Sequence, residues 1–227
     1  LFLNLIFVFQ LSMCLAQKQA DEPISYKDDL AFNATKKNDT IRLVVRNKLL
    51  TVIQISLNSK ESDTVLNSFV IHPKDSVAIV ERYSSLPDSV FWRNFNDSVR
   101  VSYNWGHEKT IAPNLNYQYR FPFKKGKKYE VSQTFHGKVS HKSKKSMYAI
   151  DFQLNVGEPV HAARGGLVIK VIDWFTKQGG KELIKAANKI VILHDDGTMA
   201  SYVHLDYQGS FVEEGEHVAE GQKIGLS

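Results

Sequence analysis

Cysteine is almost missing from this sequence, and its scarcity narrows the chemistry. The chain of 227 residues has one cysteine, Cys14, within an apolar segment at its start. A mature chain without that segment has no thiol, which excludes disulfides, zinc–thiolate sites and thiol catalysis. Stability must then come from an ordinary hydrophobic core, and 43% hydrophobic and 23% charged content are typical of a globular protein.

An initial methionine is also missing, so we expect the true start to lie upstream of Leu1. Residues 1–15 (LFLNLIFVFQLSMCL) are almost wholly apolar and precede Ala16-Gln17. This pattern is typical of a secretory signal, and about 15 residues are short for a transmembrane span. We expect residues 1–17 to be a signal peptide and the protein to be exported, as a periplasmic, cell-surface or secreted protein without a transmembrane span. A lipid anchor on Cys14 is disfavoured because Met13 is bulky where lipoprotein signals have a small residue.

The region up to residue 123 lacks any cluster of His, Asp, Glu or Ser with catalytic spacing. Residues 18–38 are polar and predict a flexible lead-in. Residues 39–123 contain about six short runs of period two separated by turn residues, which predicts a β-sandwich-like domain. The predicted strands are 40–46, 50–57, 68–72, 76–83, 98–105 and 117–123.

Acidic residues are scarce between Lys124 and Lys145, where eight lysines accompany one acid, Glu130. We expect residues 124–128 (KKGKK) to link two domains. Such a basic stretch suits an anionic partner, and for an exported protein an anionic cell-wall polymer is favoured over nucleic acid. A solvated loop without a partner is the competing interpretation.

Residues 129–227 again predict a mostly β domain. A Gly-Glu-x-Val sequence occurs at 157–160 and again at 215–218, which suggests two half-repeats. No serine-hydrolase elbow, phosphate-binding glycine loop or dinucleotide fingerprint occurs. The predicted strands are 129–135, 148–154, 159–163, 167–173, 189–194, 199–205 and 216–219, with one helix within 176–188.

Histidine is abundant in this second domain, and His141 is the most informative. It lies in a polar loop ten residues before Asp151, which sits in the apolar run 148–152. A carboxylate in such a run is costly to bury without a partner, and a zinc ion shared with an imidazole is one such partner. A surface histidine in a lysine-rich loop is the alternative. His161 and His217 are expected at the surface, and His136 precedes a glycine in a predicted turn and ranks below His141 as a ligand.

Three further residues nearer the chain's end are candidates for the site. Strand alternation puts Tyr202 and His204 on one face, and this face lines a surface or groove if Val203 and Leu205 face the core. His194 ends the preceding strand beside a predicted hairpin turn, where it either lines the site or is structural.

The stretch from Val131 to about Ser227 resembles the lysostaphin-type zinc endopeptidases of bacterial cell walls. The resemblance lies in FHGKVSH, YAIDF, VGEPVHAARGGLV, IVILHDDGTMASYVHL and VEEGEHVAEGQKIGLS taken together. It implies an antiparallel β endopeptidase domain of the duplicated hybrid motif, barrel-sandwich type, after the β-sandwich-like domain. The expected boundaries are 39–123 for the first domain and 129–227 for an endopeptidase-like domain truncated at its C-terminus.

By this resemblance, His141 and Asp151 are zinc ligands and His204 assists catalysis. Many members place the first histidine four residues before the aspartate, where this chain has Met147. A similar subgroup has it after a serine, as in Ser140-His141, with His136 as the alternative here. The family's third ligand belongs to a His-x-His pair expected beyond Ser227.

The resemblance implies a zinc metalloendopeptidase that hydrolyses peptide cross-links of peptidoglycan. Zinc would activate a water molecule, with histidine assistance. The alternative is an inactive relative that binds the wall or activates another hydrolase. A biotinyl or lipoyl carrier is disfavoured because it has no use for His141 and Asp151.

Overall fold

The computed structural model describes residues 3–9, 29–143, 146–176 and 187–227. The chain divides into two compact units, one of Met13–Glu108 and one that combines Leu1–Ser12 with Lys109–Ser227. Both are built mainly from antiparallel β-strands, which confirms the predicted fold class. Among the described residues, no helix is long and apolar enough to cross a membrane.

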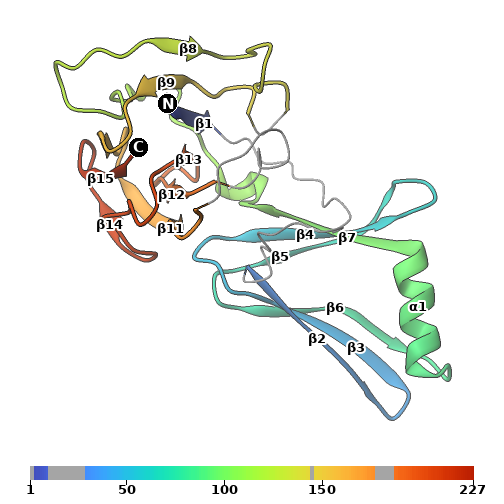
Figure 1. The fold of residues 1–227 in the computed structure, drawn as a ribbon. Coiled ribbons are helices and arrows are strands. Elements are labelled where there is room, and N and C mark those ends of the chain that lie inside the picture. Colours follow the sequence, from blue (N-terminus) through green and yellow to red (C-terminus); the bar gives the residue numbers. More distant parts are fainter. Residues whose placement is uncertain (1–2, 10–28, 144–145, 177–186) are drawn as a thin grey trace. The chain divides into compact units, whose positions relative to one another are not determined.

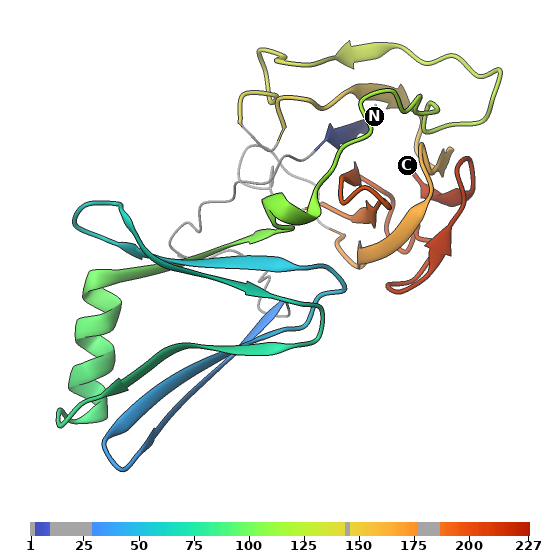
Figure 2. The ribbon, with the colours of Figure 1, turned by 180° about the vertical axis from the view of Figure 1, so that it is seen from behind.

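The first unit contains two three-stranded antiparallel sheets, in the orders β2-β3-β6 and β5-β4-β7. They form separate layers, and helix α1 lies across one end of them (Figures 1 and 2). Alternate residues of the strands, such as Ile53, Ile55 and Leu57, are buried in a shared core. The elements are β2 (Leu30–Lys37), β3 (Thr40–Asn47), β4 (Ile53–Ser59), β5 (Val65–Ile71), β6 (Ser76–Tyr83), α1 (Asp88–Ser98) and β7 (Val99–Trp105).

Two elements of this unit differ from the sequence prediction. Residues 30–37, expected within the lead-in 18–38, form β2 and pair with β3 from Leu30↔Asn47 to Lys37↔Thr40. Their sequence, LAFNATKK, has no regular alternation of apolar and polar residues, so the pairing with β3 decides their conformation. Helix α1 was not predicted, and it lacks both a side-chain cap and buried residues. Residues 10–28 lie outside the described part.

The second unit is organised around a seven-stranded sheet in the order β14-β11-β12-β13-β1-β9-β8. A separate two-stranded ribbon pairs β10 with β15. The core beneath these strands is aliphatic, with Leu154, Val160, Ile190 and Ile224 fully buried. The strands are β1 (Leu3–Phe9), β8 (Val131–Gln133), β9 (Asp151–Leu154), β10 (Pro159–His161), β11 (Gly166–Ile172), β12 (Lys189–Leu193), β13 (Met199–Val203), β14 (His217–Val218) and β15 (Lys223–Leu226).

Strand β1 lies within the segment predicted to be a signal peptide, and it runs between β9 and β13. Ile6 is level with Asp151 on one side and with Val203 on the other. Most of the helix predicted within 176–188 falls outside the described residues.

Residues 111–123, which we call the strap, pack on the second unit. The strap forms no strand, although 117–123 was predicted as one. Its backbone bonds to three separate places: Ala112 N–H to Asp196 C=O at 2.8 Å, Arg120 N–H to Ala163 C=O at 3.0 Å, and His161 N–H to Pro122 C=O at 2.9 Å. The main segment of the second unit, Lys109–Ser227, therefore includes both the strap and the linker predicted at 124–128.

The two Gly-Glu-x-Val sequences form matching turns. Gly157 and Gly215 both have positive φ, at 82° and 97°. In each turn the glutamate N–H donates 3.1 Å to the carbonyl of the residue three positions earlier. The carboxylates of Glu158 and Glu216 accept the N–H of that same residue, at 2.8 and 3.3 Å. The predicted half-repeat is thus present at the level of turns.

Candidate active site

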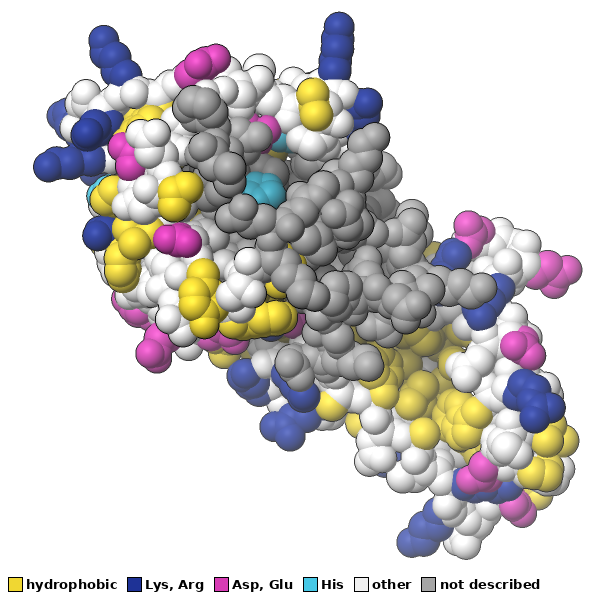
Figure 3. Space-filling model, in the orientation of Figure 1, with side chains coloured by type: hydrophobic (Ala, Val, Ile, Leu, Met, Phe, Trp, Pro, Cys, Tyr) yellow, Lys and Arg dark blue, Asp and Glu magenta, His cyan; other side chains and the backbone are white. Residues whose placement is uncertain are grey.

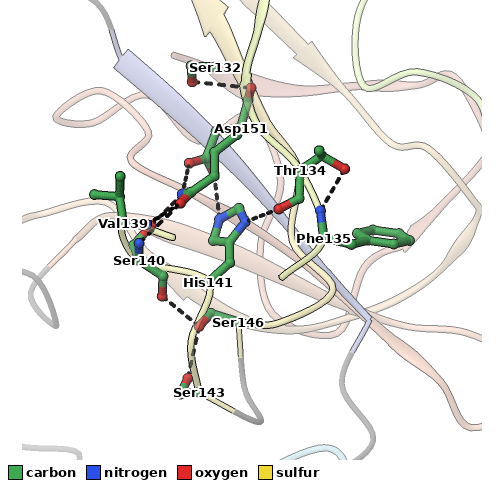
Figure 4. Close-up of polar contacts among 10 residues, drawn as sticks. Ser132, Thr134, Phe135, Val139, Ser140, His141, Ser143, Ser146 and Asp151 are labelled. Atoms are coloured by element: carbon green, nitrogen blue, oxygen red, sulfur yellow. Dashed lines mark hydrogen bonds and ion pairs between the residues drawn. The ribbon is translucent and has the colours of Figure 1, made fainter. Parts of the chain in front are cut away.

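His141 and Asp151 meet inside the second unit. His141 Nε2 lies 3.0 Å from Asp151 Oδ1, and the two residues are only 1% and 2% exposed. Asp151 begins β9 and points inward with Phe152 buried beside it, while His141 comes from the loop after β8. Figure 4 shows the His141 ring between Asp151 and Thr134. The convergence expected of the two side chains is therefore present.

The contact of the other ring nitrogen, Nδ1, sets the tautomer of His141 and so decides whether Nε2 donates or accepts. His141 Nδ1 lies 2.8 Å from the Thr134 carbonyl oxygen, which can only accept, so Nδ1 carries a proton. In the neutral ring Nε2 then presents a lone pair to the Asp151 carboxylate. Two acceptor atoms that face each other at this distance need a proton or a cation between them. The pair is thus arranged for an ion pair or for a shared metal ion.

Gln133, which the sequence did not single out, braces this pair. Its Nε2 donates to Asp151 Oδ2 at 2.9 Å and to Ser140 Oγ at 2.7 Å. Its Oε1 accepts the N–H groups of Val139 at 2.9 Å and Ser140 at 3.2 Å. A glutamine at the end of a short edge strand gives no sequence signal of its own, because only the loop's return past β8 creates these contacts.

His204 lies at the same end of the sheet as Asp151. It directly follows Val203, which is level with Ile6 and, through β1, with Asp151. Two strand spacings, roughly 10 Å of backbone, separate the two positions. Burial lowers the pKa of His204, while the negative charge of Asp151 raises it in part. A half-buried, neutral imidazole can accept a proton.

Tyr202 does not share a surface with His204. It is fully buried in the core, where its hydroxyl accepts the Ala163 N–H at 2.8 Å. Strand β13 ends at Val203, and His204 has φ of 67°, so the alternation expected through residue 205 breaks there. Tyr202 thus supports the fold beneath the candidate site, and Leu205 returns to the core.

His194 also lies away from the pair. It follows Leu193, which pairs with Met199, whereas the Asp151 end of the sheet is level with Lys189 and Val203. Five residues of strand correspond to roughly 17 Å. His194 Nδ1 donates to the Gly165 carbonyl at 2.8 Å, and its ring packs against Tyr119.

The remaining histidines do not join the pair either. His136, the alternative ligand, is exposed and packs against Tyr148 at 5.3 Å between ring centroids. His217 is exposed on β14. His161 lies on β10 and is half-buried, and burial lowers its pKa.

The donor set of the pair fits zinc. Zinc takes imidazole nitrogen and carboxylate oxygen as ligands, and His141 Nε2 and Asp151 Oδ1 are the residues that would hold it here. Within the described ranges, no group of three or more His, Cys, Asp or Glu side chains could hold a metal ion. His141 and Asp151 are thus two donors of the kind that zinc sites use.

Comparison with known proteins gives one family match, in the second unit. Residues 145–227 match peptidase family M23, a range that includes Asp151 and His204 and begins after His141. No curated protein matches. A crystal structure of a protein from Pseudomonas aeruginosa, assigned as a peptidase M23, is similar with 16% identity and a TM-score of 0.32. The match covers 85% of this chain and 62% of that one, so this chain spans less than two thirds of its length.

The match confirms the resemblance found in the sequence. The text around Asp151, His194 and His204 lies inside the matched range, together with both Gly-Glu-x-Val turns. Residues 145–227 of this chain are therefore a domain of peptidase family M23, the lysostaphin-type peptidases.

Proposed function

We propose that this protein is an exported zinc metalloendopeptidase that hydrolyses peptide cross-links of bacterial peptidoglycan. The observation that carries the proposal is the buried His141–Asp151 pair at 3.0 Å, beside a peptidase M23 domain that contains Asp151 and His204. Family M23 peptidases act on the bacterial cell wall and typically depend on zinc. Export follows from a wall substrate and from the signal-like residues 1–17.

In this proposal His141 Nε2 and Asp151 Oδ1 hold the metal. When bound, zinc activates a water molecule near neutral pH and polarises the scissile carbonyl. The Thr134 carbonyl fixes the His141 tautomer, so Nε2 offers its lone pair. The lowered pKa of His204 keeps its ring neutral and able to take a proton from the attacking water.

The test is zinc content together with digestion of purified peptidoglycan by the full-length protein. We expect bound zinc and new peptide termini in the digest. Asp151→Ala should lose both zinc and hydrolysis. His204→Ala should keep zinc and lose about 10²–10⁴-fold in hydrolysis rate, the usual contribution of a general base.

His217→Ala is the matched control, because this exposed histidine of the same unit lies outside the site. It should behave as the wild type in both measurements. Wild-type protein that binds peptidoglycan without cutting it, and that carries no zinc, would overturn the proposal in favour of a non-catalytic wall-binding or hydrolase-activating relative.

A further inference from the structure

We propose that Gln133 is the positioning residue of this site. One side chain holds Asp151 Oδ2 and also the loop that carries His141, which leaves Asp151 Oδ1 and His141 Nε2 to face one metal ion. This inference rests on the proposed function, because it concerns the orientation of that metal site.

Gln133 orients the Asp151 carboxylate. Its two oxygens have different partners: Oδ2 accepts the Gln133 amide N–H at 2.9 Å, and Oδ1 faces His141 at 3.0 Å. A carboxylate with one oxygen held in this way cannot rotate freely to offer both oxygens. Gln133 therefore selects Oδ1 as the donor and fixes its direction.

Gln133 also holds the loop that precedes His141. Gln133 Oε1 accepts two consecutive backbone N–H groups, from Val139 and Ser140, and Gln133 Nε2 donates to Ser140 Oγ. With the bond to Asp151, these contacts use both hydrogens of the amide and both lone pairs of its oxygen. The loop residues are exposed, so this side chain supplies the order that packing does not.

Gly137 is shaped to admit this side chain. A Cβ built on Gly137 would lie 2.2 Å from Gln133 Cγ and 2.5 Å from Cδ and Oε1. The φ of Gly137 is not positive, so its backbone conformation does not require glycine. Glycine is needed because a Cβ would collide with Gln133. The loop therefore closes directly over Gln133, and Gly137→Ala should displace it.

The variant Gln133→Glu tests the two roles of Gln133 separately. Gln133→Glu keeps an oxygen that can accept the Val139 and Ser140 N–H groups, but it places a carboxylate against Asp151 Oδ2. Gln133→Ala removes both the contact to Asp151 and the contacts to the loop. Gln153→Ala is the matched control, because Gln153 is a half-buried glutamine on β9, close to Asp151 in sequence.

The experiment measures zinc affinity of the full-length protein by competition with a chelator. Gln133→Glu, Gln133→Ala and Gly137→Ala should bind zinc about 10–100-fold more weakly than wild type, the usual effect of losing an outer-shell partner. Gln153→Ala should match wild type. In metal-free protein, amide exchange at Val139 and Ser140 should accelerate in Gln133→Ala and stay slow in Gln133→Glu.

The two possible failures are distinct. Wild type that binds zinc while Gln133→Glu binds it equally well overturns the positioning role, even if the variant is less stable. Unchanged exchange at Val139 and Ser140 in Gln133→Ala overturns the loop contacts. Wild type that takes up no zinc overturns the proposed function itself.

Discussion

At the scale of single residues, His194 is the clearest case of a histidine that is buried for structural reasons. It is 3% exposed, and its Nδ1 donates to the Gly165 carbonyl at 2.8 Å. Its Nε2 is buried and has no hydrogen-bond partner among the described residues. Burial lowers the pKa of His194, the bond to Gly165 raises it in part, and the Arg164 cation lowers it further. The folded protein thus favours the neutral ring.

This burial predicts a loss of stability in acid. Because the folded pKa of His194 lies below the unfolded value of 6.5, the unfolded chain binds a proton first as pH falls. The free energy of unfolding should therefore drop below about pH 6.5. His194→Gln should make this drop smaller, as measured by urea unfolding at pH 7.5 and 5.5.

His217→Gln is the control for that measurement, since His217 is exposed and should leave the pH dependence unchanged. His204 and His161 also have lowered pKa values, so part of the acid sensitivity should persist in His194→Gln. An unaltered pH dependence in His194→Gln would show that His194 is not the source.

At the scale of elements, the strap is held by a buried cation. Arg164 Nη1 donates to Asp196 Oδ2 at 2.7 Å and to the Tyr119 hydroxyl at 3.2 Å, and Arg164 Nη2 also pairs with Asp195. Its guanidinium lies 4.1 Å from the centre of the Tyr117 ring. Through Arg164, the Asp195-Asp196 turn thus anchors the strap, which lies more than 70 residues earlier in the chain.

Several hydrogen bonds fix the Asp196 carboxylate and lower its pKa. Burial raises its pKa, but hydrogen bonds from Thr198, Asn114 and Arg164 outweigh that effect and hold the pKa well below its usual range. Asn114 belongs to the strap, and its N–H lies 3.0 Å from Asp196 Oδ2.

We predict that Arg164→Ala destabilises the second unit by about 3–5 kcal/mol, because it leaves the largely buried Asp196 carboxylate without its cation. Arg120→Ala is the control on the strap itself, since the Arg120–Glu220 pair is exposed and worth about 0–1 kcal/mol. Denaturant unfolding measures both. Equal, small losses for the two variants would contradict a strap held by Arg164.

At the scale of the whole molecule, positive charge is concentrated near β8. Exposed lysines lie on both sides of this strand, and Figure 3 shows Lys and Arg side chains projecting along the same end of the unit. The strand joins the sheet edge next to Asp151. The described lysines of this group are Lys124, Lys125, Lys127, Lys128, Lys138 and Lys142.

If these lysines bind an anionic wall polymer, the association of the protein with cell walls should depend on salt. Replacing Lys124, Lys125, Lys127 and Lys128 by glutamine should weaken co-sedimentation with cell walls at low salt. The difference from wild type should shrink as salt rises, because exposed charges are screened. Walls stripped of anionic polymer serve as the control. Wild-type binding that is indifferent to both salt and polymer would favour the solvated-loop interpretation.

Much of the fold follows from local patterns. Strand β6 has the predicted bounds, Ser76–Tyr83, and β3, β7 and β12 differ from prediction only at their ends. The Gly-Glu-x-Val turns were visible because glycine is needed where φ is positive. By contrast, residues 117–123 alternate like a strand and form none, whereas residues 30–37 were not predicted as a strand and form β2. Their partners in space decide what these two segments form.

The sequence by itself determined the β architecture, the repeated turns, the lysine-rich segment and the candidates His141, Asp151 and His204, because each depends on residue type and short-range order. Only the tertiary structure decided that Gln133 braces Asp151, that Gly137 makes room for it, and that Tyr202 and His194 lie elsewhere. These facts depend on which distant segments meet, and no local pattern encodes such a meeting.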